Sequence, residues 1–242
     1  MSGHSKWSQI KHKKALTDAK RGKLFSKMAR LITVAAREKG GDPASNPKLR
    51  MAIDKARSFN MPHENIERAV KRGTGDLEGV KIEEFILEAY GPAGAALIIE
   101  GKTDNKNRTV SELKHLLSQH DGKLANPGSV LWLFERRGLI NLKKTGSLKK
   151  DILELSAIDA GAQDLRWLDE ENLEIYTQPE ELEKIKKLLE EKNIKIEEAS
   201  LGWQPKNEIT IDDPKTKERL EKLFETLDEN DDVNEIYSNI SQ

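Results

Sequence analysis

Positive side chains crowd the first thirty residues, and their chemistry stands out from the rest of the chain. The opening stretch, MSGHSKWSQIKHKKAL, holds four lysines, two histidines, one tryptophan and no acidic residue. Lysines neutralise backbone phosphates, and an aromatic ring stacks on an unpaired base. We therefore predict a nucleic-acid contact here. Its predicted residues are His4, Lys6, Trp7, Lys11, His12, Lys13, Lys14, Lys20, Arg21, Lys23, Lys27 and Arg30.

The distribution of charge along the chain supports this prediction. The formal net charge is only −1, yet residues 1–75 contain 18 basic and 6 acidic residues, a net of +12. The remaining residues contain 23 basic and 36 acidic ones, a net of −13. Such a division of charge indicates that residues 1–75 bind a polyanion. A basic run that is merely a solvated face remains an alternative, as does a Trp7 that anchors the segment to the protein.

A second polar cluster, TDNKNRT, lies between a predicted buried strand and a predicted helix. Loops in that position present polar groups at the edge of a sheet. One interpretation is a turn with a helix cap. The other is a secondary contact surface made of Asn105, Lys106, Asn107 and Arg108.

Motifs of enzyme chemistry are sparse. The chain has no cysteine, which excludes disulfides, thiolate metal sites and cysteine nucleophiles. It contains no G-x-S-x-G, Walker A or G-x-G-x-x-G motif, and the HENIE segment at His63 lacks the second histidine of a zinc motif. We expect a protein that is not an enzyme and binds no metal or cofactor. The enzymatic alternative places Mg²⁺ on carboxylates such as Asp104 or Asp121.

Composition indicates a globular protein of two or three domains, with 242 residues, 36% apolar and 34% charged. No apolar run approaches the ~18 residues of a membrane span, and no apolar core of ~7–15 residues follows the basic start as in a signal peptide. We therefore expect no membrane partner and a cytoplasmic location. A further alternative is a protein-interaction module that docks through its acidic C-terminal helix and strand.

Three helices are predicted before residue 79. The first covers residues 17–39, with its apolar residues on one arc and basic residues on the other. The second begins at Asn46-Pro47, a cap followed by proline. The third begins near Pro62 and is expected to stop at Gly73.

Strands follow. A hairpin is predicted from EEFILEAY and AALIIEG, which flank the turn GPAG. A helix with a capping box is predicted from Thr109 and Glu112, and a buried strand from SVLWLFE. Residues 138–201 then give the order βαββαβ of a ferredoxin-like domain, whose first helix is expected to bury Leu148, Ile152 and Leu155.

The last 38 or so residues are too few to fold alone, so we expect them to complete the sheet begun before the ferredoxin-like unit. The predicted fold class is α+β: an N-terminal helical bundle followed by two α/β domains, the second, ferredoxin-like one inserted in the first. The predicted division is a basic flexible arm at 1–22, a three-helix domain at 23–78, a middle domain at 79–135 plus 205–242, and an inserted domain at 136–204.

The motifs GHSKW, IKHKKA, DAKRGKLFSK, GGDPASNPKLR, AIDKA, NMP, YGPAG and DNKNRT together resemble the YebC/PmpR family, which includes mitochondrial translational activators of cytochrome c oxidase. The resemblance implies three domains, no catalysis and a DNA-binding transcriptional regulator. It also implies an alternative, a ribosome-associated factor that relieves stalling and reaches ribosomal RNA with its N-terminal segment. The positions that match the N-terminal motif are Gly3, His4, Ser5, Lys6, Trp7, Ile10, Lys11, Lys13, Lys14, Asp18, Lys20, Arg21 and Lys23.

The sequence predicts a regulator that binds nucleic acid, either duplex DNA or ribosomal RNA, with the ribosome as a further candidate partner. Charge alone does not choose between these polymers, because phosphate contacts supply affinity with both. An arm that orders on binding suits irregular RNA better than a regular groove.

Replacing Lys11, Lys13 and Lys14 by alanine is expected to weaken nucleic-acid binding without changing the thermal midpoint. Each lysine lost should flatten the slope of log affinity against log salt by about 0.7–0.9. Titrations at several salt concentrations measure this slope. An unchanged slope in the triple variant would remove the segment from the interface.

Overall fold

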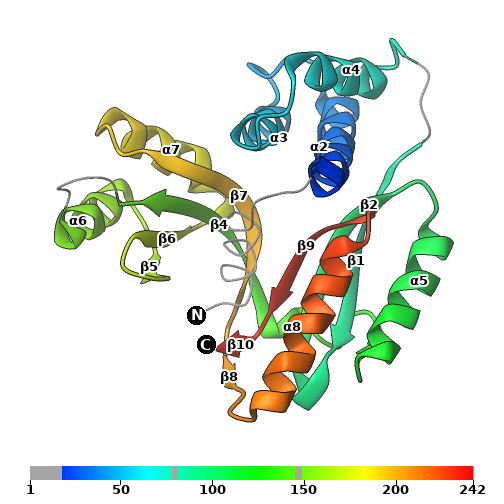
Figure 1. Ribbon diagram of the computed structural model, residues 1–242. Helices are drawn as coiled ribbons and strands as arrows, with labels where there is room; N and C mark the ends of the chain where they lie inside the picture. The colour runs from blue at the N-terminus through cyan, green and yellow to red at the C-terminus, as the bar shows by residue number, and fades with distance from the viewer. Residues whose placement is uncertain (1–17, 78–80, 145–148, 242) are drawn as a thin grey trace. The chain divides into compact units, whose positions relative to one another are not determined.

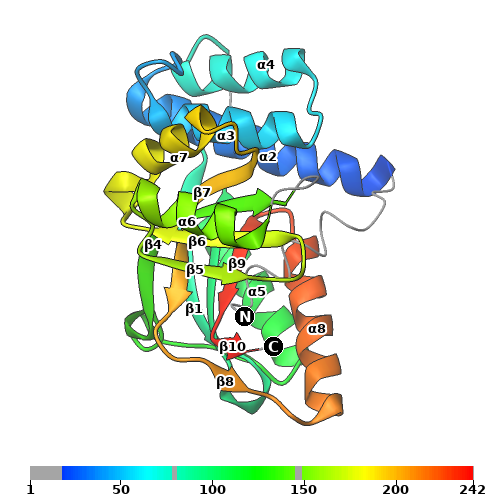
Figure 2. The same cartoon turned by 90° about the vertical axis from the view of Figure 1, so that its left-hand side faces the viewer.

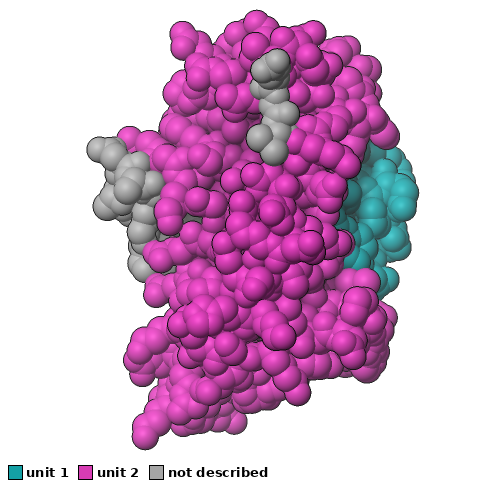
Figure 3. Space-filling view, turned by 90° about the vertical axis from the view of Figure 1, so that its right-hand side faces the viewer, with its two compact units in different colours: residues 1, 134–204 teal, residues 2–133, 205–242 magenta. Residues whose placement is uncertain are grey.

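The computed structural model describes residues 18–77, 81–144 and 149–241, with side chains from residue 21 onward. The described chain forms two compact units, one of residues 134–204 and one of the segments before and after it (Figure 3). Seven predicted contact residues lie outside the described range, as does the side chain of Lys20. The seven are His4, Lys6, Trp7, Lys11, His12, Lys13 and Lys14.

Three helices open the larger unit: α2 (Asp18–Lys39), α3 (Pro47–Ser58) and α4 (His63–Thr74). The predicted cap of the second helix is confirmed, since the Asn46 side chain accepts a hydrogen bond from the Leu49 amide at 3.0 Å. Its amide nitrogen also donates to the carbonyls of Ala35 and Gly40, at 2.8 and 2.9 Å. This buried side chain therefore starts α3 and ties it to the end of α2.

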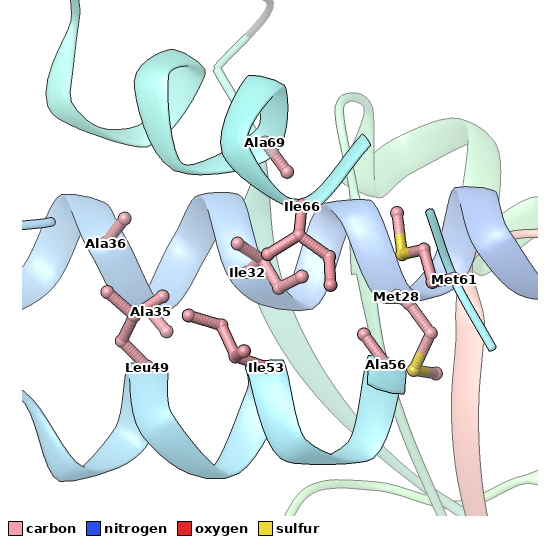
Figure 4. Packing of buried hydrophobic residues seen from close by; sticks show 10 residues of the cluster. All are labelled: Met28, Ile32, Ala35, Ala36, Leu49, Ile53, Ala56, Met61, Ile66 and Ala69. Atoms are coloured by element: carbon pink, nitrogen blue, oxygen red, sulfur yellow. The ribbon is translucent and has the colours of Figure 1, made fainter. Parts of the chain in front are cut away.

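Apolar side chains from all three helices fill one core, and in Figure 4 Ile66 of α4 lies beside Ile32 of α2. The helical spacing read from the sequence is confirmed by this burial, which supplies most of the stability of short helices. The cluster comprises Met28, Ile32, Ala35, Ala36, Leu49, Ile53, Ala56, Met61, Ile66 and Ala69.

Gly73 does not stop α4, contrary to our expectation. The helix continues to Thr74 and ends at Gly75, whose φ of 89° is left-handed. Gly73 is buried against α2, where a Cβ would lie 2.4 Å from the Thr33 carbonyl oxygen and 2.6 Å from the Ala36 Cβ. The missing side chain lets the two helices approach closely.

The sheet of the larger unit has the order β3-β1-β2-β9. Strands β1 (Glu83–Tyr90) and β2 (Ala96–Thr103) form the predicted antiparallel hairpin, and β3 (Lys123–Leu124) extends it. Strand β9 (Val233–Ser238) pairs antiparallel with β2 from the other end of the chain (Figure 1). A two-stranded parallel sheet of β8 (Ile209–Thr210) and β10 (Ile240–Ser241) completes the strands of this unit.

Helices α5 (Lys106–Gln119) and α8 (Pro214–Glu229) pack on this sheet. Their leucines share a core with residues of β1, β2 and β9, so the C-terminal helix and strand belong to the same fold as the hairpin. The core comprises Phe85, Ala89, Leu97, Ile99, Leu113, Leu117, Leu223, Leu227, Val233 and Ile236.

The predicted capping box at Thr109 and Glu112 is wrong. Helix α5 begins at Lys106, and the cap is Asn105, whose side chain accepts from the Arg108 amide at 3.1 Å. Thr109 instead lies fully buried in the first turn. Its hydroxyl donates to the buried Asp232 carboxylate at 2.6 Å, so Thr109 links distant segments and does not serve as a helix cap.

The predicted buried strand SVLWLFE is also wrong for its first five residues, 129–133. Residues Leu131–Leu133 form a 3₁₀ turn, η2, and β4 begins only at Phe134. The cause is Glu88, whose carboxylate accepts hydrogen bonds from the amides of Val130 and Leu131 at 2.5 and 2.7 Å. Those amides are therefore not available to a sheet.

The smaller unit has the strand order β5-β6-β4-β7, the arrangement of a ferredoxin-like sheet (Figure 2). Its elements are β4 (Phe134–Lys143), α6 (Lys150–Ala160), β5 (Asp164–Trp167), β6 (Asn172–Thr177), η3 (Pro179–Glu181), α7 (Leu182–Glu191) and β7 (Ile196–Pro205). Strand β6 pairs antiparallel with both β4 and β5. The predicted fold class is confirmed, whereas the domain boundaries chosen from the sequence stay predictions.

Helix α6 buries a different face from the one expected. Leu153, Ala157 and Ala160 are buried. Ile152 and Leu155 are exposed, and Leu148 lies outside the described residues. Both faces of this helix are apolar, so hydrophobic spacing alone does not select one; the buried face is the one whose two alanines permit close packing.

We expect Gly73→Ala to lower the free energy of unfolding by about 1–3 kcal/mol, because the added methyl group overlaps the Thr33 carbonyl. The matched control is Gly22→Ala in α2, where a Cβ meets nothing within 4 Å. That change should be neutral or stabilising, by up to about 1 kcal/mol. Urea unfolding of both variants measures the difference, and equal stabilities would contradict the close approach of α2 and α4.

Candidate nucleic-acid interface

The basic face of α2 divides into two parts. Arg21 and Lys23, near the start of the helix, are exposed. The Lys23 ammonium donates to the Glu229 carbonyl at 3.3 Å, a contact on the surface of the protein. These two side chains continue in the chain from the basic residues that precede α2.

Lys27, one turn further along, is only 5% exposed. Its ammonium donates to the backbone carbonyl of Asp228 and lies 3.6 Å from the Asp228 carboxylate. In this arrangement the charge of Lys27 is satisfied within the protein and does not reach a phosphate outside it.

Arg30 likewise faces the C-terminal segment. Its guanidinium donates to the Asp231 carbonyl at 2.9 Å and to the Asp232 carboxylate at 2.5 Å. Residues 23, 27 and 30 occupy one face of a helix because they are four and three positions apart. All three therefore meet one stretch of chain, residues 228–232, which we call the acidic turn.

Asp232 is the centre of this contact, and its side chain is 4% exposed. Besides Arg30, it accepts hydrogen bonds from Thr109 at 2.6 Å and from Thr103 and Arg108 at 3.0 Å each. Burial disfavours its charged form, but these hydrogen bonds and the charge of Arg30 outweigh burial, so the pKa of Asp232 lies below its ordinary value.

Sequence reasoning missed Asp232. It stands in the run DENDDVNE, where five of eight residues are acidic, and such a run ordinarily indicates a solvated turn. The only local signal is that two aspartates directly precede the strand that the structure shows as β9. Their partners lie more than a hundred residues away in the sequence.

The loop predicted as a secondary contact surface is a turn and helix cap. Asn105 caps α5, and Arg108 pairs with Asp104 at 2.7 Å and with Asp232. Lys106 and Asn107 are exposed. A nucleic-acid contact at these four residues stays a prediction.

Comparison with known proteins settles the family. The TACO1/YebC N-terminal domain matches residues 5–76, and the TACO1/YebC second and third domain matches residues 82–240. The chain belongs to the TACO1/YebC family. The resemblance noted from the sequence motifs is thereby confirmed.

Relatives in this family match almost the whole chain. A protein of Halothermothrix orenii is 52% identical over 99% of this chain and 94% of its own, and one of Persephonella marina is 52% identical over 99% and 95%. Both are named probable transcriptional regulatory proteins. The crystal structure of a conserved hypothetical protein from Aquifex aeolicus has a TM-score of 0.90 and 46% identity, covering 98% of this chain and 96% of that one.

In this TACO1/YebC protein, further ionic contacts join α3 to α2 and to the sheet. Lys48 lies 2.7 Å from Glu38 and 3.0 Å from Glu84, and Lys55 lies 2.5 Å from Glu235. Lys102 of β2 is buried and lies 3.1 Å from Glu84. Burial lowers the pKa of Lys102, and the charge of Glu84 offsets this only in part.

The carboxylates that the enzymatic alternative would use each face an arginine. Asp104 pairs with Arg108, and Asp121 lies 3.1 Å from Arg219. Over the described residues, no three histidine or acidic side chains gather in a way that could hold a metal ion. In the same part of the chain, none of the helices has the length and apolar character needed to cross a membrane.

Asp232→Asn is expected to lower the free energy of unfolding at pH 7 by about 3 kcal/mol, because it removes the charge that compensates Arg30 and Arg108. The folded-state pKa of Asp232 is depressed, so its contribution is present above the unfolded value of about 3.9 and is lost as pH falls through the folded value. The deficit of the variant should therefore shrink between pH 7 and pH 3.

Asp121→Asn is the matched control, since its ion pair with Arg219 is exposed on both sides. Urea unfolding should show a change of at most about 1 kcal/mol for that variant. A deficit of Asp232→Asn that stays constant between pH 7 and pH 3 would contradict a stabilising charge at this position.

Proposed function

We propose that this protein is a non-enzymatic regulator of gene expression that binds nucleic acid through its basic N-terminal residues. The names of the relatives support a role in gene expression. The net charge of +12 in residues 1–75, in a chain that is otherwise acidic, supports a polyanionic partner. Neither line of support depends on a catalytic motif.

The division of the basic face of α2 is the observation that carries the proposal in detail. Arg21 and Lys23 are exposed, and Lys23 makes one hydrogen bond to the acidic turn at the surface. Lys27, in contrast, is buried on the acidic turn, and Arg30 pairs with the buried carboxylate of Asp232. We assign the first pair, together with the basic residues before α2, to the nucleic-acid contact. We assign Lys27 and Arg30 to holding α2 on the acidic turn. The basic residues before α2 are then attached to a helix whose position is fixed.

A ribosome-associated translation factor is the second candidate. Most of the proposed contact residues precede α2 in the sequence, where lysines are combined with the aromatic ring of Trp7. A chain segment of that kind suits irregular, partly unpaired RNA, where bases and phosphates are not arranged in a regular groove. The names of the relatives, in contrast, favour a transcriptional regulator. A binding experiment distinguishes the two candidate functions.

The test is a binding titration at physiological salt with the full-length chain and with a variant that lacks residues 1–17. Each is offered assembled ribosomes and mixed genomic duplex DNA. We expect the deletion to weaken binding to the preferred partner at least tenfold, because it removes four lysines that contact phosphates. Tighter binding to ribosomes identifies a translation factor, and selective binding to duplex DNA identifies a transcriptional regulator.

The matched control is Lys215→Ala combined with Lys217→Ala, which removes two exposed lysines from the start of α8 without touching the proposed contact. This variant should bind as the full-length chain does. The proposal is overturned if the deletion leaves both affinities unchanged, or if the control loses as much affinity as the deletion.

A further inference from the structure

A buried carboxylate organises the loop that follows β3. Glu88 of β1 is 7% exposed, and it accepts hydrogen bonds from the backbone amides of Gly128, Val130 and Leu131, at 2.5–2.7 Å. Burial disfavours the charged form, but the three amides outweigh it, so the pKa of Glu88 lies below its ordinary value. The loop is therefore fixed on an ionised side chain.

Further hydrogen bonds hold the same loop from outside. The Tyr90 hydroxyl donates to the Ser129 carbonyl at 3.1 Å. The Lys206 ammonium donates to the Trp132 carbonyl at 2.8 Å, and the Lys206 amide donates to the Leu133 carbonyl at 2.9 Å. The backbone on both sides of Trp132 is thus held by groups from β1 and from the segment after β7.

The Trp132 side chain is nevertheless 64% exposed, the most exposed large apolar side chain of the described residues. Its indole nitrogen donates to the Ser129 carbonyl at 3.0 Å. Since the only polar group of the ring is already used within the loop, what the ring offers outside is its aromatic surface.

The segment that carries this ring and the segment that holds it each contain a lysine. Residues 122–133 and 205–207 contain Lys123 and Lys206 and no acidic residue. Among the side chains that the structure describes, neither lysine forms an ion pair. Lys123 lies opposite Tyr90 in the sheet, and Lys206 contacts the backbone of Trp132 itself.

We propose that Trp132 and Lys206 form a second nucleic-acid site, which takes one unpaired nucleobase on the indole ring and an adjoining phosphate on the ammonium. This inference rests on the proposed function and narrows its ligand to nucleic acid with unpaired bases. A ring that is fixed in place loses little conformational freedom on stacking. Paired bases inside a duplex have both faces covered by their neighbours, so a duplex does not use the ring.

The test measures the affinity of the full-length chain for a single-stranded RNA of about 12 nucleotides and for a duplex of the same length. Trp132→Ala should weaken binding to the single strand by about 5- to 100-fold and leave duplex binding unchanged. Trp132→Phe should keep most of the affinity, because the smaller ring still stacks. Lys206→Ala should flatten the salt slope for the single strand by about 0.7.

Ile86→Ala is the matched control, since Ile86 is a 50% exposed apolar side chain of β1 in the same unit. It should leave both affinities unchanged. Tryptophan fluorescence gives an independent readout, because a base stacked on Trp132 quenches emission in the wild type and this part of the quench is absent from Trp132→Phe.

Any of three results contradicts the proposed site. Trp132→Ala binds the single strand as tightly as the wild type does, or it loses as much affinity for the duplex as for the single strand, or Ile86→Ala loses as much affinity as Trp132→Ala. These outcomes differ from failure of the proposed function, which appears when the wild type binds neither nucleic acid or when removal of residues 1–17 changes nothing. Thermal midpoints of all variants confirm that each one is folded.

Discussion

The buried carboxylate of Asp232 is the interaction on which the larger unit depends. It joins four elements at one point: α2 through Arg30, β2 through Thr103, and α5 through Thr109 and Arg108, all to the start of β9. A buried charge is costly unless every lone pair is satisfied, and here hydroxyls and guanidinium groups supply the donors. The position of α2 on the sheet therefore depends on electrostatics, since the apolar cluster of the three helices and that of the sheet are separate.

This arrangement gives the basic residues of α2 two different roles. Cations that contact buried groups stabilise the fold, whereas exposed cations contribute little to stability. Lys27 is buried and Arg30 pairs with a buried carboxylate, whereas the side chains of Arg21 and Lys23 are exposed. A count of charges along the sequence treats all four alike, which is why the predicted contact is broader than the proposed one.

Features set by neighbours in sequence were predictable. The Asn46 cap, the β1–β2 hairpin and the βαββαβ order of the inserted unit follow from local patterns and are present. Features set by distant partners were not. Thr109 resembled a helix cap, but its hydroxyl donates to Asp232. SVLWLFE resembled a strand, but two of its amides donate to Glu88. The buried face of α6 was not predictable from spacing, because both faces of that helix are apolar. The residues before α2 lie outside the described structure, so their predicted contacts await binding experiments.

The pairing of β9 with β2 has a consequence for biosynthesis. Strand β2 ends at Thr103, and its partner β9 begins at Val233, after the whole inserted unit. During synthesis from the N-terminus, residues 134–204 therefore leave the ribosome before β9, the edge strand of the larger unit's sheet, has been made. At that stage Arg30 also lacks its partner Asp232, which lies 202 residues downstream. Pairing of β9 with β2 is thus one of the last steps in the folding of the nascent chain. A chain truncated before Asp232 leaves the edge of β2 exposed.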